Sequence, residues 1–184
     1  MKTLLINNYT KHLNELVKFL PGDVVVLEKE KLDDINSFDE YNLIVFSGGS
    51  NIPAVIDNKD SYKKEISMIQ NLNLPILGIC LGSEIINVAF GGTLKDLGKK
   101  IYGEYEVFVK NKSAQEILGK SIKSFEAHIF RVDFLPECFE VIADSENGIE
   151  VFKHKDKPIV GLQFHPEVDN NSLFKDYLFN TLLK

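Results

Sequence analysis

A cysteine between two glycines is the residue of this sequence best suited to chemistry. Cys80 lies at the centre of Gly78-Ile79-Cys80-Leu81-Gly82, which follows an apolar run and precedes a segment with helical spacing. A Gly-x-nucleophile-x-Gly sequence is typical of a sharp turn from a strand into a helix, where the glycines avoid clashes around a strained nucleophile. Unpaired N–H groups at the start of that helix favour the thiolate form of a cysteine. The motif predicts that Cys80 is a nucleophile in such an elbow.

A histidine and a glutamate near the C-terminus are candidates for the base and its orienting partner. Residues 158–164 resemble a strand, so His165 is expected at its end, where Pro166 ends the ladder. Alternate residues of an extended segment face the same way, so Glu167 is expected beside His165. There it would accept the Nδ1–H and leave Nε2 facing the thiol. The predicted catalytic residues are Cys80, His165 and Glu167, which only a tertiary fold can bring together.

A glycine pair after another apolar strand supplies the remaining part of an acyl-transfer site. Residues 43–47 read as a strand that runs directly into Gly48-Gly49-Ser50. The tetrahedral intermediate of acyl transfer needs N–H donors aimed at its oxyanion, each worth about 3 kcal/mol. We expect the N–H groups of Gly49 and Leu81 to fill this role.

Together, the elbow motif at residues 78–82, the loop at 47–50 and the Phe-His-Pro-Glu-Val motif at 164–168 resemble the class I glutamine amidotransferases. The resemblance covers nearly the whole chain. It implies that a Cys-His-Glu triad hydrolyses the side-chain amide of glutamine through a γ-glutamyl thioester. It also implies no cofactor, a small γ-glutamyl substrate, and a separate synthase subunit or domain that accepts the ammonia. Residues 135–143 resemble the glutaminase subunit of the GMP-synthetase branch of that family.

Two departures from the family pattern affect the substrate pocket. The family elbow usually continues Gly-His-Gln, whereas this chain has Gly82-Ser83-Glu84, so a carboxylate replaces an amide that both donates and accepts hydrogen bonds. Where branches of the family carry Ser-His or His-Ser, this chain has Ala127 followed by His128. The reaction class is therefore better defined than the substrate. The substrate-binding residues that the resemblance implies are Gly48, Gly49, Ser50, Glu84, His128 and Ile129.

These departures leave two further functions open. A stand-alone hydrolase of the same superfamily would use the triad on a γ-glutamyl compound other than free glutamine, and it would turn over fully without a partner. A non-catalytic regulatory subunit would keep the fold after its pocket had drifted, although the presence of all three triad residues argues against it. A glutaminase that serves a synthase is expected to be slow alone and stimulated by its partner.

Composition bears on several other classes of protein. With 184 residues and 44% hydrophobic content, the chain can bury a substantial core as one domain, expected to span residues 1–184. The net charge of −6 and the scattered basic residues argue against nucleic-acid binding. No apolar run reaches the roughly 20 residues of a membrane span, and we expect no export signal. Two cysteines, both expected to be free thiols, fit a reducing cytoplasm. The spacing of potential ligands predicts neither a metal site nor a phosphate-binding loop.

The order of predicted elements indicates an α/β fold. We expect a single three-layer domain with a mainly parallel central sheet, the nucleophile elbow at a strand-to-helix turn, and a smaller hairpin region in the C-terminal half. The expected strands are residues 3–7, 24–28, 43–47 and 75–79, followed by shorter runs at 105–109, 122–126, 141–144, 149–153 and 158–164. Helices are expected at residues 11–20, 61–71 and 172–183, the last capped by Asn170 or Asn171. His12 and His154 are expected at the surface, and Cys138 in a structural role.

Overall fold

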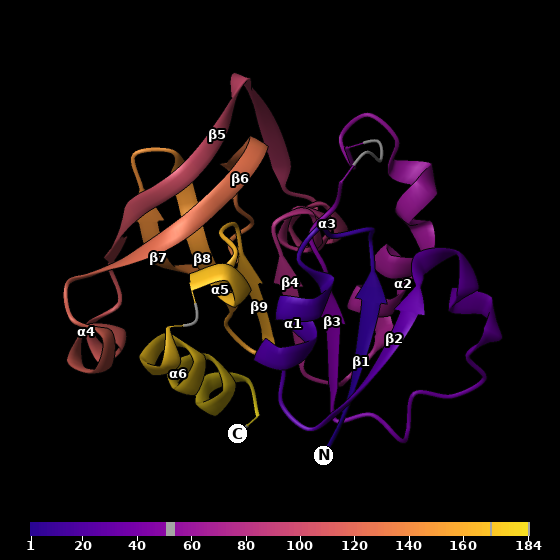
Figure 1. The fold of residues 1–184 in the computed structure, drawn as a ribbon. Helices are drawn as coiled ribbons and strands as arrows, with labels where there is room; N and C mark the ends of the chain where they lie inside the picture. Colours follow the sequence, from indigo (N-terminus) through magenta and orange to yellow (C-terminus); the bar gives the residue numbers. More distant parts are fainter. Residues whose placement is uncertain (51–53, 170, 184) are drawn as a thin grey trace.

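The computed structural model describes residues 1–50, 54–169 and 171–183. Its strands form one sheet of nine strands in the order β2-β1-β3-β4-β9-β8-β7-β5-β6 (Figure 1). Strands β4 and β9, which precede the two halves of the predicted site, are neighbours in this sheet. The strands are Lys2–Asn7 (β1), Asp23–Glu28 (β2), Leu43–Phe46 (β3), Ile76–Ile79 (β4), Thr93–Val109 (β5), Ser121–Phe134 (β6), Phe139–Ser145 (β7), Gly148–His154 (β8) and Ile159–Leu162 (β9).

The N-terminal strands pair in parallel, as the sequence predicts. β2, β1, β3, β4 and β9 run in the same direction, with Gly78 of β4 opposite Gly161 of β9. All residues of β3, β4 and β9 are buried, which explains why these strands read as short uninterrupted apolar runs. Their carboxyl ends lie at one edge of the sheet, where ligand sites of parallel α/β sheets are usually found.

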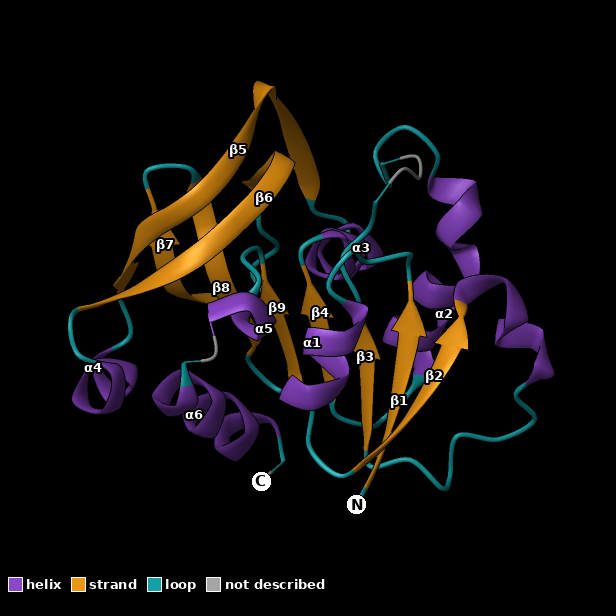
Figure 2. Cartoon of the chain, viewed as in Figure 1, coloured by secondary structure: helices purple, strands orange, loops and turns teal. Residues whose placement is uncertain are grey.

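The other half of the sheet corrects the prediction of a mainly parallel sheet. β9 pairs with β8, β8 with β7, β7 with β5, and β5 with β6, and each of these pairings is antiparallel. The α/β class is confirmed, but the sheet is mixed, and the hairpins form part of it (Figure 2). Between β7 and β8 the connection is too short for the crossover that parallel strands need.

The longest hairpin was only partly visible in the sequence. The runs expected at 105–109 and 122–126 are parts of β5 and β6, which are 17 and 14 residues long. Most residues of the first half of β5 are exposed, so this stretch lacks the apolar alternation by which a strand is recognised.

Helices cover both faces of the sheet, and each face has its own hydrophobic core (Figure 2). Successive strand residues face opposite ways, so Leu5 of β1 belongs to the same core as Leu16 and Phe174, while Leu4 belongs to the other core, with Ile85. The helices of the first face are α1 (Leu13–Phe19), α4 (Lys112–Leu118), α5 (Pro166–Asp169) and α6 (Ser172–Leu182); those of the second are η1 (Lys29–Asp34), η2 (Lys59–Tyr62), α2 (Lys63–Asn71) and α3 (Leu81–Ala89).

The three helices expected outside the elbow are confirmed with small changes in their bounds, as α1, η2 with α2, and α6. Asn171 caps α6, since its side chain accepts the N–H of Phe174 at 3.1 Å. Asn170, the other expected cap, lies outside the described residues. The sequence analysis missed α4 and α5, which are seven and four residues long and too short for a helical apolar pattern to be recognised.

Two further expectations can be compared with the structure. Both cysteines are free thiols: Cys80 is buried and Cys138 is partly exposed. Across the described part of the chain, we find no helix with the length and apolar character needed to cross a membrane.

Candidate active site

Cys80 lies in the turn between β4 and α3, as the elbow motif predicts. Its backbone has φ +50° and ψ −108°, a conformation that residues with a side chain rarely adopt. Its N–H donates to the carbonyl of Leu162 at 2.7 Å. Its own carbonyl accepts the backbone N–H groups of Ser83 and Glu84 at 2.9 and 3.1 Å, and the Ser83 hydroxyl at 2.7 Å. These hydrogen bonds hold the strained turn from both sides and fix the thiol at the start of α3.

Close backbone approach explains the two glycines of the motif. A Cβ on Gly78 would lie 2.5 Å from the carbonyl group of Gly82, and a Cβ on Gly82 would lie 2.1 Å from the carbonyl oxygen of Phe46. Both distances are far shorter than van der Waals contact, so a side chain at either position would displace backbone. The motif therefore reflects how tightly α3 packs against the strands that precede it.

His165 and Glu167 form the hydrogen-bonded pair that the sequence predicts, but the backbone that places Glu167 is helical and not extended. Nδ1 of His165 lies 2.9 Å from Oε1 of Glu167, and both residues are buried. The expectation of an extended segment was wrong, because residues 166–169 form helix α5. Pro166 begins this helix, where its fixed φ is favourable and its missing N–H is not needed. The carboxylate accepts the Nδ1–H and leaves Nε2 available to the thiol.

The loop after β3 packs against both halves of the site. A Cβ on Gly48 would lie 3.0 Å from Cε1 of His165 and 3.5 Å from Cβ of Cys80. Ser47 fixes this loop, since its hydroxyl accepts the N–H of Asn8 at 2.8 Å and donates to the carbonyl of Gly48 at 2.9 Å. The fold thus brings together Cys80 and His165, which lie far apart in the sequence.

The surroundings of His165 favour its charged form. Burial acts to lower the pKa of this histidine, but hydrogen bonds and charge interactions with Cys80 and Glu167 outweigh burial and raise the pKa to about 10. At neutral pH the imidazolium is therefore the favoured form beside Cys80. A positive imidazolium next to a cysteine stabilises the thiolate, which is the nucleophilic form.

Two aromatic side chains outside the predicted site residues pack against His165. The ring centroids of His12 and Phe125 lie 5.4 and 6.4 Å from that of His165, each in an edge-on arrangement. The backbone N–H of His165 also donates to the carbonyl of Phe125 at 2.8 Å. The sequence analysis expected His12 at the surface and did not predict this contact. It also expected His154 at the surface, which was wrong because His154 is buried. An isolated histidine has no pattern in the sequence from which either environment could be read.

The groups predicted for the oxyanion lie around Cys80. Leu81 is the first residue of α3, and Gly49 follows the glycine that packs against the thiol. Neither N–H has a hydrogen-bond partner among the residues that the structure describes. Both residues line the same cavity as Cys80. Donors without internal partners are available to an oxyanion that forms there.

The cavity beside Cys80 has a volume of about 490 Å³. Five of the six predicted substrate-binding residues line it, and the sixth, Gly48, lies behind them against Cys80 and His165. Its lining carries charges of both signs, which suits a zwitterionic amino acid. The lining residues are Lys11, Gly49, Ser50, Ala54, Asp57, Cys80, Leu81, Glu84, Lys100, Ala127, His128, Ile129 and Phe130.

Glu84, where the family has glutamine, is buried at the edge of this cavity with an exposed fraction of 4%. Its Oε1 accepts a long hydrogen bond of 3.4 Å from Nε2 of Gln163. Burial raises the pKa of Glu84, while the hydrogen bond from Gln163 and the charge of His128 oppose this. Glu84 therefore presents a carboxyl group, in place of the amide of the family, at the edge of the cavity.

A second group of titratable side chains lies next to the cavity wall. Glu126, His128 and Glu150 are buried, and one potential ligand atom from each lies within 4.8 Å of the others. The spacing argument that predicted no metal site could not detect this group, because its members come from β6 and β8. Both ring nitrogens of His128 already have protein partners, Nδ1 with the carbonyl of Phe130 at 2.7 Å and Nε2 with Oε2 of Glu126 at 3.1 Å.

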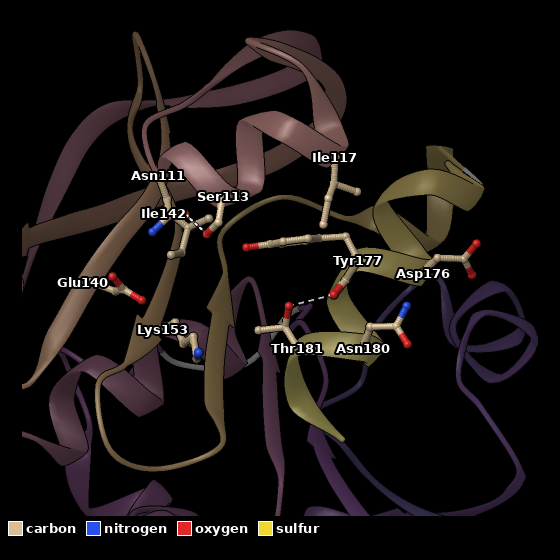
Figure 3. Close-up of a pocket in the computed structure, with 10 residues that line it drawn as sticks. All are labelled: Asn111, Ser113, Ile117, Glu140, Ile142, Lys153, Asp176, Tyr177, Asn180 and Thr181. Atoms are coloured by element: carbon tan, nitrogen blue, oxygen red, sulfur yellow. Dashed lines mark hydrogen bonds between the residues drawn. The ribbon is translucent and has the colours of Figure 1, made fainter. Parts of the chain in front are cut away.

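Another cavity, of about 510 Å³, shares no lining residue with the cavity of Cys80. It lies where α4 and α6 face β7 and β8, and the ring of Tyr177 extends across it (Figure 3). Neither cysteine nor histidine lines it, and we assign no reaction to it. Its lining residues are Asn111, Ser113, Ile117, Glu140, Ile142, Lys153, Asp176, Tyr177, Asn180 and Thr181.

Comparison with known proteins identifies the family. The family model described as Glutamine amidotransferase class-I matches residues 4–184. The glutamine-hydrolysing GMP synthase subunit of Methanosphaera stadtmanae is 34% identical over 180 residues, which cover 92% of this chain and 90% of that protein. The protein of the same name from Methanocaldococcus jannaschii is 32% identical over 175 residues, which cover 94% of this chain and 89% of that protein.

Solved structures share the fold. A Thermoplasma acidophilum protein assigned as one subunit of a GMP synthase superposes with a TM-score of 0.81 at 27% identity, over 100% of this chain and 92% of that one. A glutamine amidotransferase from Thermotoga maritima has a TM-score of 0.75 at 22% identity, over 100% of this chain and 86% of that one, which supports the fold alone. The family match includes the elbow and the His-Pro-Glu motif. The chain therefore belongs to the class I glutamine amidotransferase family, and it is a cysteine-dependent enzyme of that family.

Proposed function

We propose that this protein hydrolyses L-glutamine to glutamate and ammonia, with Cys80 as nucleophile, His165 as acid and base, and Glu167 as the group that orients His165. The observation that carries the proposal is the position of Cys80 in a strained elbow beside a hydrogen-bonded His165–Glu167 pair. The elbow opens onto a cavity of about 490 Å³, large enough for an amino acid.

The proposed reaction has two steps. The Cys80 thiolate attacks the side-chain amide carbon, and the oxyanion that forms accepts hydrogen bonds from the N–H groups of Gly49 and Leu81. His165 gives its proton to the amide nitrogen, the C–N bond breaks, and ammonia leaves a γ-glutamyl thioester. His165 then takes a proton from water, which attacks the thioester and releases glutamate and the thiolate. No step requires a cofactor.

We assign the binding of the amino-acid end of glutamine to the lining of the cavity. Glu84 lines the cavity from α3, and residues 127–130 line it from β6. A carboxyl at this position can pair with the α-ammonium group of the substrate. The proposed binding residues are Gly48, Gly49, Ser50, Glu84, His128 and Ile129.

We also propose that the ammonia passes to a separate synthase subunit. The archaeal relatives are named as one subunit of a glutamine-hydrolysing GMP synthase, which implies a second subunit that completes GMP synthesis. We place the reaction in the cytoplasm, since a free catalytic thiol suits a reducing compartment.

Glu84 favours one alternative, a stand-alone hydrolase of another γ-glutamyl compound. A carboxylate in place of an amide changes which charged groups the pocket accepts, and it would repel an α-carboxylate that glutamine brings close to it. The two functions differ in a measurable way, because the stand-alone hydrolase would turn over fully without a synthase subunit.

The test is ammonia and glutamate release by the purified chain, with and without the synthase subunit of an archaeal GMP synthase. Four proteins are compared: the natural chain, Cys80→Ala, His165→Ala and Cys138→Ala. Cys138→Ala is the matched control, because it removes the other free thiol at a site away from the cavity. We expect equimolar ammonia and glutamate from the natural chain and from Cys138→Ala, faster with the synthase subunit. The Cys80 and His165 variants should lose at least a hundredfold in rate.

Release of ammonia by Cys80→Ala at the natural rate would refute the proposed mechanism. Turnover of another γ-glutamyl amide, but not of glutamine, would support the stand-alone hydrolase. An unreactive Cys80 toward a thiol reagent at neutral pH, with no turnover of any substrate, would support the regulatory role.

A further inference from the structure

One buried hydroxyl group beside the candidate site has two backbone partners, and the proposed reaction steps do not use it. Ser47 follows β3 and has an exposed fraction of 0%. Its Oγ lies 2.8 Å from the backbone nitrogen of Asn8 and 2.9 Å from the carbonyl oxygen of Gly48. An N–H only donates and a carbonyl only accepts, so the direction of both hydrogen bonds is defined. The hydroxyl accepts from Asn8 and gives its one hydrogen to Gly48.

The carbonyl that accepts this hydrogen belongs to the same peptide group as the N–H of Gly49. Gly48 and Gly49 are joined by a trans peptide bond. In a planar trans peptide, the C=O and the N–H point in opposite directions. A hydrogen bond that fixes the carbonyl of Gly48 therefore also fixes the direction of the Gly49 N–H, which is one of the two proposed donors to the oxyanion.

The order of the strands indicates which way this N–H points. β3 lies between β1 and β4 in the sheet, where Asn8 follows β1 and Cys80 follows β4. The Ser47 hydroxyl, which is bonded to Asn8, holds the Gly48 carbonyl toward the β1 side. We therefore expect the Gly49 N–H on the opposite side, toward β4 and Cys80. In agreement with this direction, Gly49 and Cys80 line the same cavity.

The two glycines make the orientation of this peptide group depend on a hydrogen bond from elsewhere. Gly48 has little space for a side chain, because a Cβ there would lie 3.0 Å from Cε1 of His165. Without a Cβ on either side, the peptide plane can turn over, since glycine occupies regions of φ and ψ that other residues avoid. The close packing of this loop against the site therefore also removes a steric restriction on the peptide group. The hydrogen bond from Ser47 replaces that restriction.

We propose that Ser47 is a positioning residue that holds the Gly49 N–H toward the oxyanion of the tetrahedral intermediate. The proposal rests on the proposed glutaminase function, which makes Cys80 the nucleophile. Without the hydroxyl, the Gly48 carbonyl loses this donor, which favours the opposite orientation of the peptide group, with the carbonyl toward the site. The oxyanion forms only as the reaction proceeds, so loss of the hydroxyl should lower kcat and leave KM for glutamine nearly unchanged.

The first experiment observes this peptide group by NMR, in protein made by cell-free synthesis with glycine that carries ¹³C at its carbonyl carbon and ¹⁵N. A spectrum that correlates each amide with the preceding carbonyl then detects only the two glycine–glycine peptides of the sequence, Gly48-Gly49 and Gly91-Gly92. Gly91-Gly92 is the internal control, since its N–H donates to the carbonyl of Asn87 at 2.8 Å.

In Ser47→Ala we expect the Gly48 carbonyl resonance to move upfield, because this carbonyl loses a hydrogen bond. The residual dipolar coupling of the Gly49 N–H should change as the peptide group turns, whereas the signals of Gly91-Gly92 should stay in place. An unchanged carbonyl resonance and coupling for Gly48-Gly49 would overturn the proposal, whether or not the protein hydrolyses glutamine.

The second experiment measures kcat and KM for glutamine in the natural chain, Ser47→Ala and Thr3→Val. Thr3 is the matched control, because its buried hydroxyl also donates to a backbone carbonyl, that of Pro21 at 2.7 Å, near the start of β1 and away from the cavity. We expect Ser47→Ala to lose about tenfold to a hundredfold in kcat, with KM changed by less than about twofold. Thr3→Val should keep both constants of the natural chain.

An unchanged kcat in Ser47→Ala would overturn the positioning role. Equal losses of kcat in Ser47→Ala and Thr3→Val would also overturn it, because a general loss of packing would explain both. If the natural chain does not hydrolyse glutamine, the proposed function fails, while the NMR measurement still decides the orientation of the Gly48–Gly49 peptide group.

Discussion

At the scale of single residues, the charge state of the candidate site depends on the contact between His165 and Glu167. The pKa of His165 is raised to about 10, against the effect of burial, by its hydrogen bonds and charge interactions with Cys80 and Glu167. The pKa of His165 is 6.5 in the unfolded chain and higher in the folded protein, so the folded state binds this proton more tightly. The interaction therefore makes its full contribution to stability below pH 6.5. This contribution is lost as the pH rises through 10.

Glu167→Gln tests this dependence. A neutral amide removes the negative charge that favours the imidazolium, so the pKa of His165 should fall and the alkaline limb of the pH–rate profile should move to lower pH. We also expect kcat for glutamine to fall about a hundredfold or more, because the ring loses the acceptor that fixes its tautomer. The pH–rate profile and the NMR titration of the His165 ring measure both effects.

Glu106→Gln is the control for this experiment, since Glu106 is an exposed glutamate on β5. It should leave the profile unchanged. An alkaline limb that stays in place in Glu167→Gln would show that Glu167 does not control the charge of His165.

At the scale of elements, the site depends on how closely the elbow and helix α5 are packed. α3 begins against the carbonyl of Phe46, which leaves no space for a side chain at Gly82. Asp169 of α5 connects this helix to β6. Its carboxylate accepts hydrogen bonds from the hydroxyl of Ser124 and from the N–H of Phe125, both near the start of β6. Both contacts join elements distant in the sequence, so the positions of Cys80 and Glu167 depend on packing rather than on local preference.

Gly82→Ala measures the packing of the elbow. Its Cβ would meet a backbone carbonyl oxygen at 2.1 Å, so α3 or β3 must move. We expect a loss of about 3 kcal/mol or more in the free energy of unfolding, which lowers Tm by about 6–12 °C in a chain of this size. Thermal unfolding followed by circular dichroism is the measurement.

Gly91→Ala is the matched control, because its Cβ would meet nothing within 4 Å and only its positive φ opposes the change. It should cost about 1–2 kcal/mol. An equal loss of Tm in both variants would mean that the close approach at Gly82 is not what the elbow requires.

At the scale of the whole molecule, buried carboxyl groups outside the triad set how stability changes with pH. Burial raises the pKa of Glu65 to about 7, although Lys29 lies 3.8 Å from its Oε2. At this distance the lysine only partly offsets the loss of hydration. The folded protein therefore binds a proton here that the unfolded chain has lost above pH 4.5. Stability from this group is full below pH 4.5 and is lost as the pH rises through 7.

Glu65→Gln should remove this part of the pH dependence, because the amide stays neutral at every pH. We expect Tm of the natural chain to fall between pH 5 and 8, and the fall to be about 5 °C smaller in Glu65→Gln. Scanning calorimetry at both pH values makes the comparison, with the exposed Glu116→Gln as control. Parallel curves for the natural chain and Glu65→Gln would contradict the raised pKa.

The sequence predicted well those parts of the fold in which local pattern and burial coincide. The short apolar runs of β3, β4 and β9 are buried throughout, so each was recognised as a strand. The sequence did not predict the first half of β5 as a strand, because its mostly exposed residues show no alternation of apolar and polar side chains. It also missed α5, because a helix of four residues depends on its neighbours rather than on its own pattern.

By itself, the sequence predicted Cys80 as the nucleophile, His165 as its base and Glu167 as the orienting carboxylate, because the glycines at 78 and 82 and the His-Pro-Glu motif encode local backbone geometry. Only the tertiary structure decided that β4 and β9 are neighbours, that Gly48 packs against both Cys80 and His165, and that His12 joins them. It alone revealed the buried pair of Glu126 and Glu150, which come from different strands. Contacts between distant segments arise from the packing of two cores on one mixed sheet, and no short stretch of sequence contains that information.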